Sequence, residues 1–497
     1  MKRLILVTGI LAATLSLNSV AAEPALTFTK VWSHKHGTDQ GTIGQVSEVP
    51  AFDRRTNTVW VAGVVGVDIL DASTGARVGH FDVTPYGAVN SVAIHNGLAA
   101  LAIEAGSSPA PGRARPGRVL LVDTKTRALS DGVNDIEVGA LPDMLTFTHD
   151  GQKLLVANEG TPNTYGARIG TSVPRVFGPA ADDPAGSVTI INMETRTVVA
   201  TAGLSGVPIA GDNVRTTTGM DFEPEYIAVS QDGTEAFVTL QEGNAMGVLD
   251  LATNAFTQVI GLGAKDFNLA GNQIDPRDDN IINFGAHVAK GLYMPDGIAA
   301  YQWRDDIYLV MANEGDFRED DGDRSAAGAA EPLDRLRVSN TDSSPGKLFA
   351  AGARSFSIRH KTGYLAYDSG DLLDKKAAEL GLYNDSRSRD KGVEPEGVAL
   401  LDLGGRTYAF IGLERTLKAA VAVFDVTDPT AVTYVDMIVT DGDLSPEGLT
   451  AYRFRGQAYL AISNEVAPAG GTSNTTLYRL DRVLPKPKPK PKPKLKP

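Results

Sequence analysis

The chain has 497 residues, and 42% of them are hydrophobic, which is enough to bury a large core. It contains no cysteine, which excludes disulfide bonds, thiolate catalysis and zinc sites with cysteine ligands. The formal net charge of −13 at pH 7 argues against nucleic acid as a partner. It favours soluble cations, or a substrate that is approached through a bound metal.

The first 22 residues have the pattern of a secretory signal peptide. Lys2 and Arg3 precede a mostly apolar run, and Val20 and Ala22 fit the small residues of a signal-peptidase site. The run is too short to span a membrane, and no later apolar run approaches the roughly 20 residues that a crossing needs. We therefore expect residues 1–22 to be removed, and the mature protein to be secreted or periplasmic without a transmembrane segment.

A β-strand is expected next, at Leu26–Trp32, and two histidines follow it directly. Of the seven histidines in the chain, His34 and His36 are the two that lie close together in the sequence. We expect a surface pair at a strand end. The alternative is a pair that binds a transition metal.

One pattern then recurs with irregular insertions. Its first half is an acidic residue after a proline, followed by a short apolar or alternating stretch. Its second half is a β-rich run that closes on a glutamate, as in "YLVMANE" and "YAFIGLE". Alternation and turns such as "HDG" between the runs are typical of antiparallel strands. The first half occurs at Pro142-Asp143, Pro224-Glu225, Pro295-Asp296, Pro395-Glu396 and Pro446-Glu447, with weaker copies at Glu48 and Asn90.

Seven such units with almost no helical periodicity predict an all-β fold, a seven-bladed β-propeller that spans residues 23–483 as a single domain. Each small sheet can bury its faces only against its neighbours, so the units must form a ring. The strand at Leu26–Trp32 has no partner in the first unit, and we expect it to complete the last blade and close the ring. A two-domain β-sandwich is the competing architecture, but it does not explain the similarity of the units.

The repeated acids are predicted to converge on one mouth of the central channel. In each unit, one carboxylate lies where the innermost strand begins and the other where the next, antiparallel strand ends. Like charges roughly 5 Å apart repel by about 3 kcal/mol at an effective dielectric of 20, and bound cations are the simplest offset. An all-oxygen set of ligands favours Ca²⁺. The predicted metal ligands are Glu48, Asp143, Glu159, Glu225, Glu242, Asp296, Glu314, Glu396, Glu414, Glu447 and Glu465, and Glu104 would join them.

An alternative for each of these acids is structural. A repeated carboxylate can accept hydrogen bonds from backbone N–H groups of the next blade, or it can stay neutral with a raised pKa.

Basic residues accompany one of the predicted pairs. Arg387 and Arg389 lie shortly before Glu396, and Arg415 directly follows Glu414. Guanidinium groups match the oxygens of phosphate and other oxyanions, so these three arginines are candidate catalytic residues. Alternatively, they only neutralise the local acids.

Several motifs resemble a known family. "GALPDMLTFTHDGQKLLVANEGTPN", "GVEPEGVALLDLGGRTYAFIGLER", "DLSPEGLTAY" and "SEVPAFDRRTNTVWVAG" are similar to the choice-of-anchor I family of secreted bacterial propeller proteins, over about residues 27–482. That family is related to mesenchyme-specific cell-surface glycoproteins linked to biomineralisation, and its members are often described as alkaline-phosphatase-like. Its catalytic residues are not established, so no active site is carried over. The resemblance implies an extracellular, calcium-linked propeller.

The C-terminal tail departs from the family pattern. Members commonly end in a sorting or anchoring segment, whereas residues 484–497 include "PKPKPKPKPKLKP". Such a segment is expected to be extended and semi-rigid. It serves either as a solubilising or linker tail, or for loose attachment to an anionic envelope polymer at the cell surface.

Two functions follow from these observations. We favour a secreted calcium-binding propeller that acts as a metal-dependent phosphoesterase on extracellular phosphate esters, because no recognisable Ser, Cys or His nucleophile motif is present. The alternative is a non-catalytic extracellular propeller that holds calcium for structural reasons or captures an anionic polymer or a mineral surface. In both cases we expect a monomer.

Overall fold

The computed structural model describes residues 25–39, 41–106, 112–161, 184–216, 222–317, 324–466 and 471–483. The predicted signal peptide and the Pro-Lys tail lie outside these residues. Strands dominate the described part, which confirms the all-β prediction. Its helical elements are α2 (Leu372–Glu379) and the 3₁₀ turns η1 (Gly112–Ala114), η2 (Leu333–Arg335) and η3 (Asp385–Arg387).

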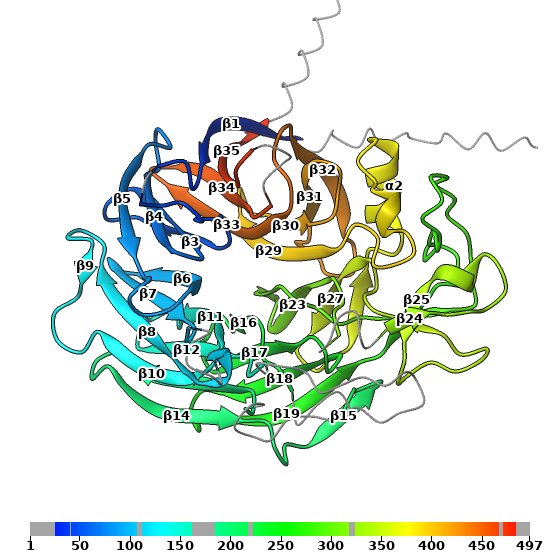
Figure 1. Cartoon of the computed structure of the whole chain (residues 1–497), viewed down its shortest axis with the longest axis horizontal. Coiled ribbons are helices and arrows are strands. Elements are labelled where there is room, and N and C mark those ends of the chain that lie inside the picture. The colour runs from blue at the N-terminus through cyan, green and yellow to red at the C-terminus, as the bar shows by residue number, and fades with distance from the viewer. Residues whose placement is uncertain are drawn as a thin grey trace, which may run out of the picture.

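Most of the described strands belong to seven sheets of four or five strands, which follow one another along the chain (Figure 1). The first sheet holds β2 (Pro50–Asp53), β3 (Thr58–Gly63), β4 (Gly66–Asp71) and β5 (Arg77–Asp82). The second holds β6 (Val89–His95), β7 (Leu98–Ile103), β8 (Pro116–Asp123), β9 (Ala128–Leu129) and β10 (Asp135–Ala140). The third holds β11 (Pro142–Phe147), β12 (Lys153–Asn158), β13 (Ser187–Asn192) and β14 (Thr197–Gly203).

The remaining sheets continue the series. The fourth holds β15 (Ile209–Asp212), β16 (Ile227–Val229), β17 (Glu235–Leu240), β18 (Ala245–Asp250) and β19 (Ala255–Leu262). The fifth holds β22 (Ile298–Trp303), β23 (Asp306–Asn313), β27 (Ser355–His360) and β28 (Leu365–Asp368). The sixth holds β29 (Pro395–Asp402), β30 (Thr407–Leu413), β31 (Ala419–Asp425) and β32 (Thr433–Thr440). The seventh holds β33 (Pro446–Phe454), β34 (Gln457–Asn464), β35 (Asn474–Val483) and β1 (Ala25–Lys35).

Two smaller sheets lie in the insertions before and within the fifth sheet. One joins β20 (Ala264–Asp266), β21 (Lys290–Leu292) and β26 (Phe349–Ala350), and the other joins β24 (Arg324–Ala326) to β25 (Arg337–Ser339).

The N-terminal strand completes the last sheet. β1 pairs antiparallel with β35 in a register that runs from Ala25 opposite Val483 to Lys35 opposite Asn474. The two ends of the described chain therefore lie side by side in one sheet (Figure 1). This pairing confirms the prediction that the strand at Leu26–Trp32 joins the last unit.

One edge strand of each sheet contacts the corresponding edge strand of the next. These contacts run in order through β2, β6, β11, β16, β22, β29 and β33, and β33 returns to β2. At this last junction the N–H of Gly448 donates to the carbonyl of Glu48 at 3.0 Å. A Cβ on Gly448 would lie 2.3 Å from that carbonyl oxygen, so only glycine permits this approach.

The hydrophobic core is divided into layers between neighbouring sheets. On β3, Trp60 and Ala62 pack toward the second sheet, while Val59 and Val61 pack toward the seventh. This alternation follows from the two-residue period of a strand. Comparable clusters lie between the two sheets of each remaining successive pair, so each sheet depends on both neighbours for the burial of its apolar side chains.

The acids that close the third strand of several units belong to turns. Oδ1 of Asp71 accepts hydrogen bonds of 2.9 Å from the backbone N–H groups of Ser73 and Thr74. Asp123 and Asp250 do the same in their sheets. Because antiparallel strands alternate in direction, these acids lie at the opposite end of the sheet from the acids at the start of the first strand. They are structural caps and take no part in the site described below.

Candidate functional site

A shared backbone arrangement holds the two acids of a unit together. The residue before the proline of the Pro-acid motif is left-handed, and its carbonyl accepts the N–H of the glutamate that ends the second strand. Residues other than glycine rarely adopt this backbone conformation. Such strain is typical of sites where the surrounding structure fixes a group in place. The three copies are Leu141 (φ 47°) with Glu159 at 2.9 Å, Glu394 (φ 53°) with Glu414 at 2.9 Å, and Ser445 (φ 50°) with Glu465 at 2.9 Å.

The acids at the starts of the first strands meet in one cavity of about 380 Å³. All the predicted metal ligands except Glu159 and Glu242 line it. The second unit contributes Asn90 where the other units have an acid. The full lining is Glu48, Val49, Asn90, Asp143, Glu225, Tyr226, Gln241, Asp296, Glu314, Asp316, Glu396, Glu414, Arg415, Glu447 and Glu465. We call this the acidic cavity.

Three groups of carboxylates at the acidic cavity share one arrangement, although Glu159 in one of them is not part of the lining. Each combines the first-strand acid of a sheet, the acid that ends its second strand, and the first-strand acid of the next sheet. In each group, one oxygen of every member lies within 4.8 Å of the others. The groups are Asp143, Glu159 and Glu225, then Asp296, Glu314 and Glu396, then Glu396, Glu414 and Glu447. Sequence reasoning predicted the pairs within a unit but not the third member.

These carboxylates face the cavity yet are surrounded by protein, which disfavours their charged form. Burial, followed by the charge of Glu159, raises the pKa of Asp143 to about 7. Burial and the neighbouring Glu465 raise the pKa of Glu447 to about 8. For Glu225, Asp296, Glu396 and Glu414, burial together with neighbouring acids raises the pKa well above the ordinary value. At neutral pH the acidic cavity therefore has a strong tendency to take up positive charge, as protons or as metal ions.

Of the two forms of the structural alternative, the hydrogen-bonded one is not seen at three of these acids, whereas the raised pKa values agree with the neutral one. Within the described residues, the carboxylates of Asp143, Glu225 and Asp296 have no hydrogen bond from a backbone N–H of the next sheet. Their oxygens are therefore directed at one another and at the cavity.

Two predicted acids and one weaker candidate are not part of this lining. Glu159 is in contact range of Asp143 and Glu225. Burial, followed by the charges of Glu223 and Glu159, raises the pKa of Glu242, and its buried Oε2 has no hydrogen-bond partner in the described part of the chain. Glu104 is separate, because it pairs with Arg113 at 3.9 Å.

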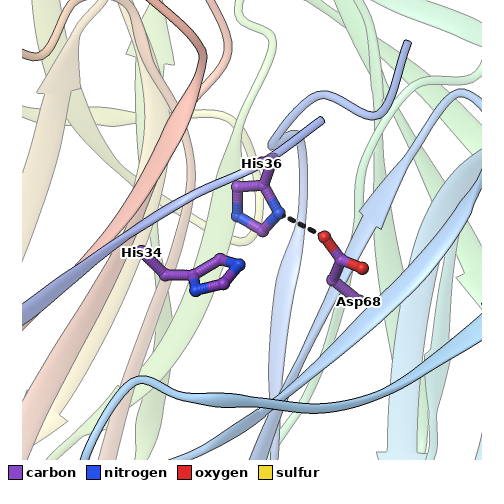
Figure 2. A group of neighbouring side chains, drawn as sticks. All are labelled: His34, His36 and Asp68. Carbon is purple, nitrogen blue, oxygen red and sulfur yellow. Dashed lines mark hydrogen bonds and ion pairs between the residues drawn. The ribbon is translucent and has the colours of Figure 1, made fainter. Parts of the chain in front are cut away.

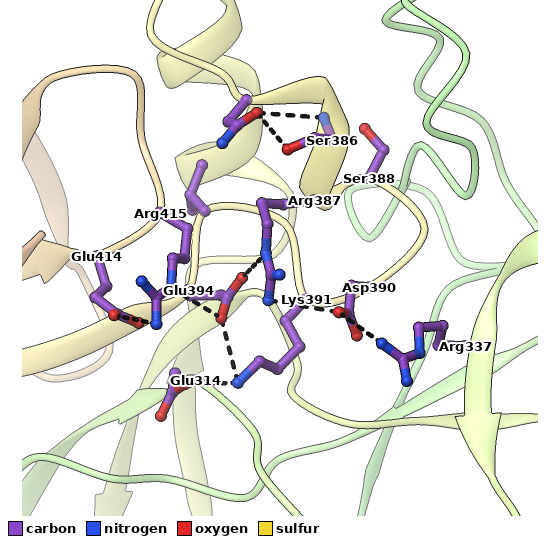
Figure 3. Close-up of polar contacts among 12 residues, drawn as sticks. Glu314, Arg337, Ser386, Arg387, Ser388, Asp390, Lys391, Glu394, Glu414 and Arg415 are labelled. Atoms are coloured by element: carbon purple, nitrogen blue, oxygen red, sulfur yellow. Dashed lines mark hydrogen bonds and ion pairs between the residues drawn. The ribbon is translucent and has the colours of Figure 1, made fainter. Parts of the chain in front are cut away.

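One side of the acidic cavity carries basic residues (Figure 3). Arg415 lines the cavity, with its guanidinium 2.6 Å from Oε1 of Glu414. The buried Lys391 lies with its Nζ 2.7 Å from Oε1 of Glu314 and 3.2 Å from Oε2 of Glu394. Burial disfavours the charge on Glu394, but Lys391 and the nearby arginines outweigh it and lower the pKa of Glu394.

The other two predicted arginines do not line the acidic cavity in the described structure. Arg387 lies one layer behind it, with its Nε 2.6 Å from Oε1 of Glu394 and its guanidinium 3.4 Å from Asp390 (Figure 3). Arg389 is directed elsewhere, because its Nε pairs with Oδ2 of Asp278 at 3.2 Å and its side chain is 44% exposed. The predicted cluster of three arginines is therefore reduced to Arg415 at the cavity itself.

Sequence reasoning missed several members of this region. Glu394 is the first residue of an "EPE" motif, and the same motif begins at Glu223. The repeated motif could have indicated both of its glutamates, but only the second glutamate of each copy was predicted as a ligand. Asp316 and Tyr226 line the cavity but stand outside the repeated Pro-acid positions.

No helix in the described part of the chain is long and apolar enough to cross a membrane. A family model described as choice-of-anchor I domain matches residues 48–429. Among solved structures, hydrazine synthase from Kuenenia stuttgartiensis is similar, at 12% sequence identity over 90% of this chain and 99% of that chain, with a TM-score of 0.48. This likeness is too weak to carry a functional argument. No curated protein matches the chain.

Proposed function

The chain belongs to the choice-of-anchor I family, and from this premise we propose that its seven sheets form a β-propeller whose acidic cavity binds calcium outside the cytoplasm. The cycle of contacts from β2 through β33 and back to β2 supports a closed ring, as does the pairing of β1 with β35. The predicted signal peptide supports export.

Calcium binding is supported by the chemistry of the ligands. The acidic cavity offers carboxylate oxygens without sulfur or clustered imidazole, which is the ligand set that hard divalent cations prefer. Acids from successive sheets gather within 4.8 Å of one another. Their raised pKa values indicate that ionisation is held back by burial and mutual repulsion, and a bound cation relieves both.

We further propose that the bound ions make this site a phosphoesterase. The observation that favours catalysis is that Glu396 belongs to two carboxylate groups at once, which places two candidate cation positions next to each other. Bound divalent ions coordinate phosphate oxygens and lower the pKa of a water molecule. Arg415 lies beside these groups and can donate to a phosphate oxygen at the same cavity.

The binding part of this proposal is tested by calorimetric titration of chelator-treated full-length protein with Ca²⁺ and with Mg²⁺. Glu225→Gln and Glu396→Gln remove one charge each from the acidic cavity and are expected to weaken Ca²⁺ binding by about tenfold or more, which corresponds to about 1.4 kcal/mol. Glu137→Gln is the matched control, because Glu137 is exposed on β10. Absence of Ca²⁺ binding by the wild type, or equal binding by all variants, would overturn the proposed site.

The catalytic part is tested separately with a chromogenic phosphate monoester and diester. Calcium-dependent release that is lost in Glu396→Gln and kept in Glu137→Gln is the expected result. Calcium binding without turnover of either ester would instead establish the alternative, a non-catalytic extracellular propeller that uses the ions to capture an anionic polymer. The pairing of Arg415 with Glu414 favours that alternative, because in it the arginine only balances a local acid.

A further inference from the structure

A second polar cluster lies at the seam between the first and the seventh sheet (Figure 2). His34 is on β1, His36 directly follows β1, and Asp68 is on β4. His36 is 1% exposed and Asp68 is fully buried. The expectation of a surface histidine pair is therefore wrong for His36, because β1 is covered by its packing against the first sheet.

The three side chains converge on a small volume. Nδ1 of His36 lies 2.7 Å from Oδ2 of Asp68, and the two imidazole rings are 4.9 Å apart between centroids, nearly perpendicular. One nitrogen from each histidine and one oxygen from Asp68 all lie within 4.8 Å of one another. No other described part of the chain gathers imidazole and carboxylate donors in this way.

The imidazole of His36 is oriented by a group on its far side. Nε2 of His36 lies 2.8 Å from Oγ1 of Thr475 on β35. Histidines that bind metals commonly have the second ring nitrogen held by such a partner, which fixes the tautomer and the direction of the ring.

The charge around Asp68 leaves room for a cation. Its Oδ1 is 2.8 Å from Nδ1 of His80 and 3.5 Å from the guanidinium of Arg77. That guanidinium is itself paired with Asp39 at 2.5 Å, so its charge is largely compensated. Oδ2 of Asp68 faces His36 and lies 2.7 Å from its Nδ1, a contact that a bound ion would replace.

We propose that His34, His36 and Asp68 bind a transition-metal ion, of which Zn²⁺ is the best match, and that this ion clamps the first sheet to the last. Two imidazole nitrogens with one carboxylate oxygen suit Zn²⁺ far better than Ca²⁺. Three protein donors leave one position of the tetrahedron for water. Because β1 and β4 belong to different sheets, the ion fastens the ring where its two ends meet. The three ligands are not among the residues that line the acidic cavity.

The proposed metal site is also linked through hydrogen bonds to the segment that carries Glu48, the first acid of the acidic cavity. Oγ1 of Thr475, which holds His36, lies 2.7 Å from Oγ of Ser47, and Ser47 precedes Glu48. Fixing His36 therefore helps to fix the backbone from which Glu48 projects.

The full-length protein, treated with chelator, is loaded with Zn²⁺ in the presence of excess Ca²⁺, so that calcium occupies the acidic cavity. The zinc that remains after gel filtration is measured by atomic emission. Co²⁺ is used in parallel, because a tetrahedral site with nitrogen ligands gives it intense visible absorption. The variants are His34→Gln and Asp68→Asn, with His360→Gln as control, since His360 lies on β27 and contacts Thr362 and Asp306, away from the cluster.

We expect one zinc ion per chain, a zinc-dependent rise in Tm, and visible cobalt absorption in the wild type and in His360→Gln. All three are expected to be lost in His34→Gln, whose Tm in chelator shows that it still folds. Wild-type protein that retains no zinc, or His34→Gln and Asp68→Asn that retain it with the same cobalt spectrum, would overturn the proposal. Neither result depends on whether the acidic cavity binds calcium.

Discussion

Nζ of Lys391 lies 2.7 Å from Oε1 of Glu314, so one of the acids that line the acidic cavity is paired with a cation that belongs to the protein. Burial disfavours the charge on Lys391, but Glu314, Asp316 and Glu394 outweigh it and raise the pKa of the lysine well above its ordinary value. The acids on this side are partly neutralised by the chain.

Replacing Lys391 by methionine tests this relationship. The change leaves Glu314 and Glu394 buried without their shared cation, and removal of one partner from a buried ion pair costs about 3–5 kcal/mol. We expect a loss of that size in the free energy of unfolding by urea, measured in chelator. Lys361→Met is the control, because the pair of Lys361 with Glu235 is partly exposed and is expected to contribute less than about 1 kcal/mol. Equal losses in the two variants would show that Lys391 does not compensate the cavity.

The junction between the seventh and first sheets is tested by Gly448→Ala. The added Cβ would lie 2.3 Å from the carbonyl oxygen of Glu48, so β33 and the segment that precedes β2 must move apart. Overpacking of this kind costs about 1–3 kcal/mol. Gly203→Ala is the matched control, since nothing lies within 4 Å of its added Cβ and its backbone is not left-handed. We expect only Gly448→Ala to lower Tm; similar Tm values for the two variants would contradict the close approach.

The sequence indicated the repeated hairpins because the two-residue alternation and the Pro-acid motif are local patterns. The convergence of Asp143 with Glu159 could be predicted for the same reason, because it requires only one hairpin. The local patterns could not reveal that Glu225 joins them, because contacts between sheets depend on how neighbouring units pack.

The same limit applies to residues held by insertions or by the chain ends. Lys391 reaches Glu314 only because the segment after α2 folds back toward the fifth sheet. His36 is buried because β1 pairs with β35 more than 400 residues later in the chain, as its contact with Thr475 at a separation of 439 shows. The positions of Arg387 and Arg389 depend on the same inserted segment, and their spacing in the sequence gave no indication that Asp278 would attract Arg389.

The raised pKa values predict a dependence of stability on pH and on calcium. Burial, followed by the charges of Glu465, Asp143 and Glu104, raises the pKa of Glu48 to about 8, and Glu447 behaves in the same way. A carboxyl whose pKa is higher in the folded state binds its proton more tightly there. Between the ordinary pKa near 4.5 and about 8, the folded state holds more protons than the unfolded state, so stability falls as pH rises through this range.

In chelator, Tm is therefore expected to decrease from pH 5 to pH 8, and Ca²⁺ is expected to raise it most at the alkaline end, where protons compete least. Calorimetry in two buffers of different ionisation enthalpy should show proton release on Ca²⁺ binding at pH 7. Glu48→Gln removes one of the titrating groups and should make the decrease in Tm shallower. A Tm in chelator that rises between pH 6 and pH 8 would contradict the sign of these shifts.

The last prediction separates the two roles open to Arg415. In the phosphoesterase, its guanidinium donates to a phosphate oxygen, a contact worth about 1.5–3 kcal/mol, so Arg415→Gln should lower kcat/KM by about tenfold to about a hundredfold. Arg389→Gln is the control, because Arg389 pairs with Asp278 and does not line the cavity. In the non-catalytic role, Arg415 only balances Glu414, and its replacement removes a positive charge beside the cation sites. Arg415→Gln would then bind Ca²⁺ more tightly than the wild type, while binding of a phosphate monoester to the calcium-loaded protein stays unchanged. Calorimetric titrations of Ca²⁺ and of the monoester into these two variants decide which role the arginine has.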